Sequence, residues 1–135
     1  MDVLTQGREG AEQLGQAVLL AALDDLTVTE YILEPGTEPG DPHYHANHTD
    51  SFYVIEGELE FNIDGRAIRA EAGTIVVAPR GAVHAFPVAI GSRARFLNLH
   101  TPGGFERYLR KLNEMRARGK KPDTDFLESH DSYNV

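Results

Sequence analysis

The sequence predicts an all-β domain followed by one C-terminal helix. Runs of β-branched and aromatic residues recur along the chain, and Gly, Pro, Asn or Asp signals separate them roughly every eight to twelve residues. No segment before residue 104 has the apolar periodicity of a helix, which a parallel sheet would need between its strands. This pattern is typical of a barrel or a sandwich. We expect a single domain over residues 1–135, with a barrel over about 11–101.

The expected strands follow one another with clear breaks between them. Residues 1–15 are polar and Gly-rich and predict a short strand or an ordered arm. Further strands are expected at 17–22, 27–33, 51–56, 58–63, 66–70, 74–78, 83–88 and 93–100. Within 58–63, the apolar Leu59, Phe61 and Ile63 alternate strictly with polar residues. Asp64-Gly65 follows directly and is a type I′ hairpin signal.

The character of the chain changes after residue 100, where the sequence TPGG interrupts the strand pattern. An apolar stripe at helical spacing follows: Phe105, Tyr108, Leu109, Leu112 and Met115. It predicts a helix over about 104–118 that packs against the sheet. Gly119 and Pro122 are signals that end it. Residues 119–135 are polar and are expected to form a tail, either loose or covering a partner subunit.

Composition narrows the range of partners. Hydrophobic residues make up 41% of the chain, charged residues 25%, and the formal net charge is −8. This charge argues against binding to nucleic acid or to an anionic membrane surface. No secretory signal and no apolar run of membrane-spanning length is evident, so we expect a cytoplasmic protein. Because the chain has no cysteine, any metal must be held by His, Asp or Glu.

Two blocks of sequence carry the chemistry, PGDPHYHANHTDSFYVIEGELEF and GTIVVAPRGAVHAF. In the first, His43 and His45 are two residues apart, so both imidazoles point to the same side of an extended strand. Asp50 follows five residues later, and His84 of the second block ends a further strand and turn. Neutral imidazoles with one carboxylate suit a divalent transition metal, and four such groups leave coordination positions free for a substrate.

The two blocks resemble the two motifs of the cupin superfamily, in particular small single-domain cupins of the quercetin-dioxygenase-like kind. The first motif of that family has two His two apart, a Glu five residues later and a Gly seven residues after that. The corresponding residues here are His43, His45, Asp50 and Gly57. The second motif is matched by Gly73, Pro79, Gly81 and His84. The resemblance covers about residues 26–100 and implies a double-stranded β-helix, a jelly-roll barrel with its metal in one mouth.

By position, the resemblance implies His43, His45 and His84 as imidazole ligands and Asp50 as the carboxylate ligand. Asp is one methylene shorter than the Glu of the family, so its carboxylate reaches about 1.5 Å less. Three arrangements remain open: the strand shifts inward and Asp50 ligates, Asp50 holds a metal-bound water, or three His form an open centre of the kind Zn favours. The metal itself also remains open among Fe, Mn, Ni, Cu and Zn.

Other residues near the motifs are candidates for supporting roles. His48 raises the option of a fourth imidazole, but its place in a turn predicts an exposed residue. His100 closes the last strand, and His100 and Tyr44 are candidates for moving protons beside the metal. The aromatic rings of Tyr44, Phe52 and Phe86 could line the mouth of a pocket or pack in the core.

The resemblance implies a metal-dependent enzyme, and dioxygenation of a small aromatic or enol substrate is the leading interpretation. An isomerase, epimerase or decarboxylase would use the metal only as a Lewis acid. A barrel that binds a small molecule without turnover is the third interpretation. A homodimer is expected from the resemblance, and because the edges of a β-rich fold need cover.

Overall fold

The computed structural model of the chain describes residues 3–135. In chain order its elements are β1 (Glu12–Leu14), β2 (Ala17–Leu23), β3 (Leu26–Leu33), β4 (His43–Tyr44), β5 (Thr49–Glu56), β6 (Glu58–Ile63), β7 (Arg66–Glu71), β8 (Ile75–Ala78), β9 (Val88–Ala89), β10 (Ala94–Thr101), α1 (Phe105–Ala117), α2 (Thr124–Ser129) and β11 (Tyr133–Asn134). The prediction of a mostly β fold with a C-terminal helix is confirmed.

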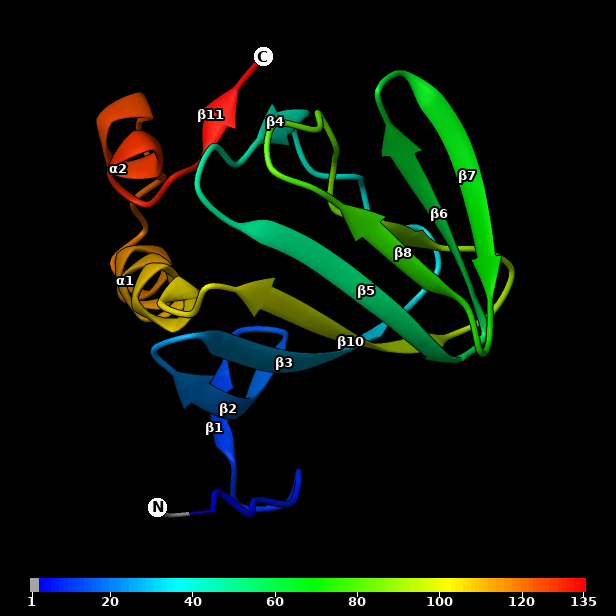
Figure 1. Cartoon of the computed structure of the whole chain (residues 1–135), viewed down its shortest axis with the longest axis horizontal. Helices are drawn as coiled ribbons and strands as arrows, with labels where there is room; N and C mark the ends of the chain where they lie inside the picture. The colour runs from blue at the N-terminus through cyan, green and yellow to red at the C-terminus, as the bar shows by residue number, and fades with distance from the viewer. Residues whose placement is uncertain (1–2) are drawn as a thin grey trace.

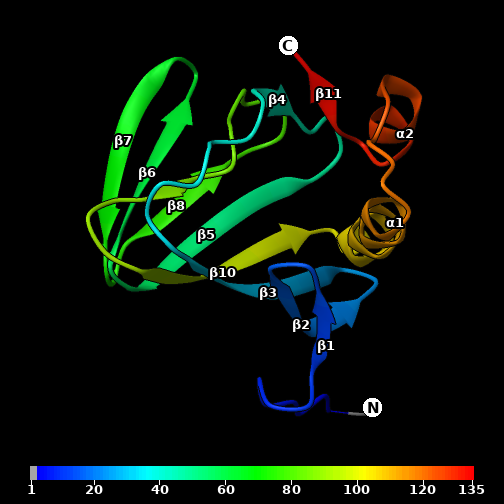
Figure 2. The ribbon, with the colours of Figure 1, turned by 180° about the vertical axis from the view of Figure 1, so that it is seen from behind.

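The strands form two facing sheets joined at their edges (Figure 1). The larger sheet has the order β1-β2-β3-β10-β5-β8, and the smaller has the order β7-β6-β9. A short pair, β11 with β4, closes one end of the barrel (Figure 2). The paired strands are antiparallel, and strands distant in sequence lie side by side, as β10 does between β3 and β5. This is the architecture of a double-stranded β-helix.

The core lies between the two sheets, where alternate residues point inward. Leu59 and Phe61 of β6 are almost fully buried, as the strict alternation in this strand predicts. The ring of Phe61 contacts that of Phe52 on β5, with centroids 5.0 Å apart. Phe96 of β10 lies in the same cluster, 6.1 Å from Phe52. Burial of these rings from both sheets stabilises the barrel together with the rest of the core cluster.

The β6–β7 hairpin turns at the predicted residues. Asp64 and Gly65 both have positive φ, 49° and 80°, which a type I′ turn requires at its two central positions. Ile63 and Arg66 are paired on either side of the turn. The hairpin and its turn residues are therefore as predicted.

Gly57 is the position where a side chain would do most harm to the barrel. Its φ is +77°, and an added Cβ would collide with the carbonyl oxygen of Arg93 and with Ala94. We expect Gly57→Ala to lower the free energy of unfolding by about 2–4 kcal/mol, because backbone strain and the collision add. Gly65→Ala is the matched control: φ there is +80°, but an added Cβ meets nothing within 4 Å.

We expect Gly65→Ala to lower the free energy of unfolding by only about 1–2 kcal/mol, because it adds the strain of a left-handed residue without the collision. Urea unfolding of the two variants measures the difference. Equal losses in the two variants would mean that the backbone around Gly57 relaxes freely, contrary to this expectation.

Residues 83–88 differ from the single strand expected there. Only β9 is regular, and before it His84 makes isolated bridges with His43 and with Ile63. Pro87 lacks an N–H and cannot donate to a ladder, which explains the break. His84 therefore lies in a loop whose backbone is held by the bridge to His43 on one side and the bridge to Ile63 on the other.

The C-terminal part is folded rather than loose. Helix α1 occupies the segment where the apolar stripe predicts a helix, and α1 and α2 lie together at one end of the barrel (Figures 1 and 2). Strand β11 pairs Tyr133 with Tyr44 and Asn134 with His43. The segment after α1 is thus tied to the strand that carries the first motif. Within residues 3–135, neither helix is both long and apolar enough to cross a membrane.

Candidate metal centre

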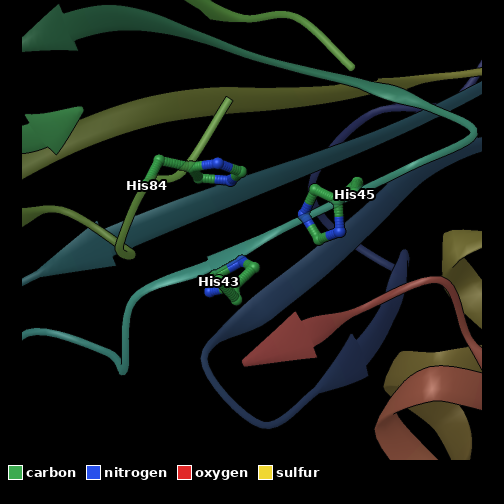
Figure 3. A group of neighbouring side chains, drawn as sticks. All are labelled: His43, His45 and His84. Atoms are coloured by element: carbon green, nitrogen blue, oxygen red, sulfur yellow. The ribbon is translucent and has the colours of Figure 1, made fainter. Parts of the chain in front are cut away.

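Three imidazoles from the two sequence motifs converge at one mouth of the barrel. Their rings face one shared space (Figure 3), and one ring nitrogen from each lies within 4.8 Å of the others. The backbones of His43 and His84 are joined by two hydrogen bonds, with N–O distances of 2.9 and 2.8 Å. His45 follows two residues after His43 and returns to the same side. The convergence predicted for His43, His45 and His84 is therefore present.

Each of the three rings is oriented by a backbone carbonyl. Nδ1 of His43 lies 2.8 Å from the carbonyl oxygen of Asp41, and Nδ1 of His84 lies 3.0 Å from that of Ala82. Nδ1 of His45 lies 2.8 Å from the carbonyl oxygen of Asp131. Because a carbonyl can only accept a hydrogen bond, each Nδ1 carries a proton. Nε2 is then the atom available to a metal in all three residues, a common arrangement in His metal sites.

Burial favours neutral rings at this site. His45 and His84 are only 4% and 3% exposed. Burial lowers the pKa of His43 to about 4, so its ring is neutral at pH 7. Burial alone would also lower the pKa of His84, but the hydrogen bond with Asp50 raises it above its ordinary value. Metal binding would displace the proton shared by His84 and Asp50, which makes metal affinity depend on pH.

Asp50 reaches the imidazoles in spite of its short side chain. Its Oδ2 lies 3.1 Å from Nε2 of His84 and 3.5 Å from Nε2 of His45. Two ligand atoms bound to one ion at about 2.1 Å, with bond angles of about 90–110°, are separated by about 3.0–3.4 Å. Burial would raise the pKa of Asp50, but the nearby His100, His45 and His84 hold it well below its usual range. The residue is therefore an anion at the centre of the cluster.

Asn98 and His100 support Asp50 from the neighbouring strand. Asn98 donates from Nδ2 to Oδ1 of Asp50 and, over 2.9 Å, to the carbonyl oxygen of Ser51. His100 is paired with Asp50 in the β10–β5 register, and its Nε2 lies 3.3 Å from Oδ1. The His100 ring stacks on Phe105 with centroids 3.8 Å apart. Our sequence reasoning missed Asn98, although it lies two residues before His100 and so shares its inward face.

The expectation that His48 is exposed is wrong. Its exposed fraction is only 8%, and its ring stacks on that of His45 with centroids 4.0 Å apart. Its Nδ1 lies 2.8 Å from Oδ2 of Asp131. The carboxylate of Asp131 also accepts the backbone N–H groups of Ala46 and Asn47, at 2.9 and 2.8 Å. The turn is covered because the C-terminal segment folds back over it, a contact that local sequence does not reveal.

Tyr44 lies outside the candidate centre. Strand alternation places it opposite its neighbours His43 and His45. Its ring stacks on Tyr133 of β11 with centroids 5.1 Å apart, and Tyr44 does not line the cavity beside the imidazoles. The two aromatic rings hold the C-terminal strand on β4. Tyr44 is therefore placed to support the strand rather than to move protons at the centre.

Asp131 orients two histidines through separate atoms, its carbonyl oxygen contacting His45 and its carboxylate contacting His48. Asp131→Ala keeps the carbonyl that contacts His45 but removes the carboxylate that holds His48 and the backbone N–H groups of Ala46 and Asn47. Because these contacts hold the turn that directly follows His45, we expect the substitution to weaken metal binding by about 10-fold. Competition with a chelator of known affinity measures the dissociation constant of the metal.

Asp123→Ala is the control for this prediction. Asp123 caps α2 by accepting the N–H of Phe126 at 2.8 Å, so its loss loosens the same C-terminal segment without touching a histidine. Metal affinity should stay within about threefold of the unmodified protein. An equal loss in both variants would show that Asp131 acts only through folding of the segment.

A cavity of about 410 Å³ opens beside the imidazoles. The barrel lines it with aromatic rings and polar groups: Tyr31, Phe52, Phe86, Asp50, Asn98 and His100. Helix α1 and the C-terminal segment close the opposite side with Tyr108, Leu109, Leu112, Arg116, Leu127 and Ser132. A larger hollow of about 700 Å³ along β1 and β2 has no His among its lining residues. The cavity beside the imidazoles is therefore the candidate substrate site.

Sequence comparisons agree with the motif positions. The family model described as Cupin domain matches residues 29–100. Over 72 residues the chain is 31% identical to quercetin 2,3-dioxygenase of Bacillus subtilis strain 168, a match that covers 53% of this chain and 21% of that protein. A match to an uncharacterized protein of Aquifex aeolicus strain VF5 has 40% identity and covers 32% of this chain and 36% of that protein. The chain thus spans about a fifth to a third of the length of these relatives.

Solved structures share the fold. KdgF from Halomonas sp. superposes with a TM-score of 0.61 at 26% identity, covering 67% of this chain and 81% of that one. An RmlC-like cupin from Shewanella frigidimarina NCIMB 400 gives a TM-score of 0.66 at 22% identity, and the match covers 78% of this chain and 96% of that one. The polyketide cyclase RemF from Streptomyces resistomycificus gives a TM-score of 0.60 at 23% identity, and the match covers 74% of this chain and 80% of that one. At the identities of the last two, the likeness shows the fold alone.

Proposed function

The chain belongs to the cupin superfamily, and from this premise we propose that it is a metal-dependent enzyme acting on a small molecule. The metal ligands in this proposal are His43, His45, His84 and Asp50. The observation that carries it is the shared orientation of the three rings, each with Nδ1 on a backbone carbonyl, which leaves Nε2 as the ligand atom. Nε2 of His84 and Nε2 of His45 lie 3.1 and 3.5 Å from Oδ2 of Asp50, the fourth ligand of the proposal. A divalent transition metal fits this donor set of neutral imidazoles and one carboxylate.

The reaction we propose is dioxygenation of a small aromatic or enol substrate. The similarity to quercetin 2,3-dioxygenase over 72 residues supports it, as do the aromatic walls of the cavity. A bound metal would supply redox or Lewis-acid chemistry at the substrate oxygens. Phe52 and Phe86 would hold a flat substrate ring and exclude water. Asp50, kept anionic, would ligate or accept a substrate proton, and Asn98 and His100 would hold it in place.

Oxygen uptake by the metal-loaded protein tests this proposal. A panel of catechols, flavonols and enolisable ketones is offered with and without O₂, and substrate loss is followed beside O₂ consumption. Coupled loss of both supports dioxygenation. Turnover that continues without O₂ would reject dioxygenation in favour of an isomerase, epimerase or decarboxylase. Binding without any turnover would reject the enzyme and leave a ligand-binding barrel.

A homodimer is our prediction for the assembly. Strand β8 is an edge of the six-stranded sheet, and Ile75 and Val77 on it are 60% and 47% exposed. An edge strand with exposed apolar side chains is a ready surface for pairing with a second copy. Light scattering over a wide concentration range should give twice the chain mass, and a single-chain mass at every concentration would contradict the prediction.

The cytoplasmic location expected from the sequence also stays a prediction.

A further inference from the structure

Arg116 extends the cavity-facing side of helix α1 with a positive charge. It follows Leu112 by four residues and Leu109 by seven, so the three side chains share one helix face. All three line the cavity beside the candidate metal centre. The apolar stripe that packs α1 on the barrel therefore ends in a guanidinium group at the cavity.

Arg116 is an exposed residue at the cavity and has no direct carboxylate partner in the described part of the chain. Arg116 is the only Lys or Arg among the described residues that line the cavity, whose lining also includes the carboxylates of Glu38, Asp41 and Asp50. It forms no ion pair with a carboxylate among residues 3–135, although the whole chain carries a net charge of −8. Arg110, on the same helix, is paired with Glu12 at 2.9 Å. An unpaired guanidinium beside a cavity in an acidic protein is free to bind an anion.

Two tyrosines, Tyr31 and Tyr108, line the same cavity as Arg116. Burial raises the pKa of Tyr31, the charge of Asp50 raises it further, and the charge of Arg116 lowers it. Burial also raises the pKa of Tyr108, again against the charge of Arg116. Tyr31 thus lies within the influence of both Asp50 and Arg116, and both hydroxyls stay protonated as hydrogen-bond donors.

We propose that the natural ligand is a small aromatic or enol carboxylic acid whose carboxylate binds Arg116. The inference rests on the proposed function, because the oxygens at the other end of the ligand would bind at the His and Asp50 centre. Phe86 and Leu112 line the apolar space for the ligand body, and Tyr31 and Tyr108 add O–H donors to the lining of the same cavity. A single cation matches the single charge of a carboxylate better than the double charge of a phosphate monoester.

Catechol, 3,4-dihydroxybenzoate and 3,4-dihydroxyphenylacetate are the probes that test this. All three carry the same metal-binding pair of oxygens, and the last two add a carboxylate at different reach. Binding to the metal-loaded protein is measured by calorimetry without O₂, so that no turnover occurs. We expect at least one carboxylate to bind about 10- to 100-fold more tightly than catechol, the range for a hydrogen-bonded charge pair.

Two variants locate the source of that preference. Arg116→Gln should remove it and leave the affinity for catechol unchanged. Arg118→Gln removes a positive charge two residues away on a side chain that does not line the cavity, and the preference should persist. Equal binding of all three probes by the unmodified protein, or a preference that survives in Arg116→Gln, overturns the inference while leaving the metal centre standing. If no probe binds, the proposed function fails and the inference fails with it.

Discussion

Replacing His84 with alanine is expected to abolish stoichiometric metal binding. Metal content should fall from about one ion per chain to below about 0.1, because the variant lacks one of three imidazole donors and a contact of Asp50. Elemental analysis of tag-free protein, after metal loading and desalting, measures the content. The metal found also directs the next step: Fe, Mn, Ni or Cu favours oxygen chemistry, and Zn favours Lewis-acid chemistry.

His130→Ala is the matched control for this experiment. His130 packs against Phe126 and Tyr108 on the C-terminal segment and lies outside the group of converging imidazoles. The His130→Ala protein should retain about one metal ion per chain. Circular dichroism confirms that both variants fold. Unchanged metal content in a folded His84→Ala protein would refute the site, as would a protein that takes up no metal on titration before any substitution.

Replacing Asp50 with asparagine is the second change with a large expected effect. The side chain keeps its shape but loses its charge, and its amide N–H₂ cannot ligate a metal. We expect metal affinity to fall at least about 100-fold and turnover to be lost, because the anion that lies 3.1 Å from His84 and 3.5 Å from His45 disappears. Chelator competition measures the affinity, and oxygen uptake measures the turnover.

Asp41→Asn is the control, because Asp41 also lines the cavity but reaches the histidines only through its backbone carbonyl. The metal affinity of the Asp41→Asn protein should stay within about threefold of that of the unmodified protein. Undiminished affinity in Asp50→Asn would show that three His suffice and that Asp50 does not ligate. Loss of turnover with undiminished affinity would assign Asp50 to the substrate or to a bound water.

Much of the barrel could be predicted because its signals are local. The alternation in β6 reports directly which face is buried, and Asp64-Gly65 reports the turn because few other pairs tolerate two positive φ angles. The apolar stripe from Phe105 predicts α1 for the same reason. The prediction was less good at residues 83–88, where a loop pinned by long-range bridges replaces most of the expected strand.

The all-β fold and the β6–β7 hairpin could be predicted from the sequence because strand periodicity and turn signals act over a few residues. The convergence of His84 with His43 and His45 could be predicted only through the resemblance of the two motifs to those of cupins. That Asp50 reaches two imidazoles could not be predicted, since it depends on where β5 lies relative to both motifs. The same holds for the burial of His48 by Asp131, which lies at the other end of the chain. Contacts of that range follow from how whole elements pack, and no local pattern encodes them.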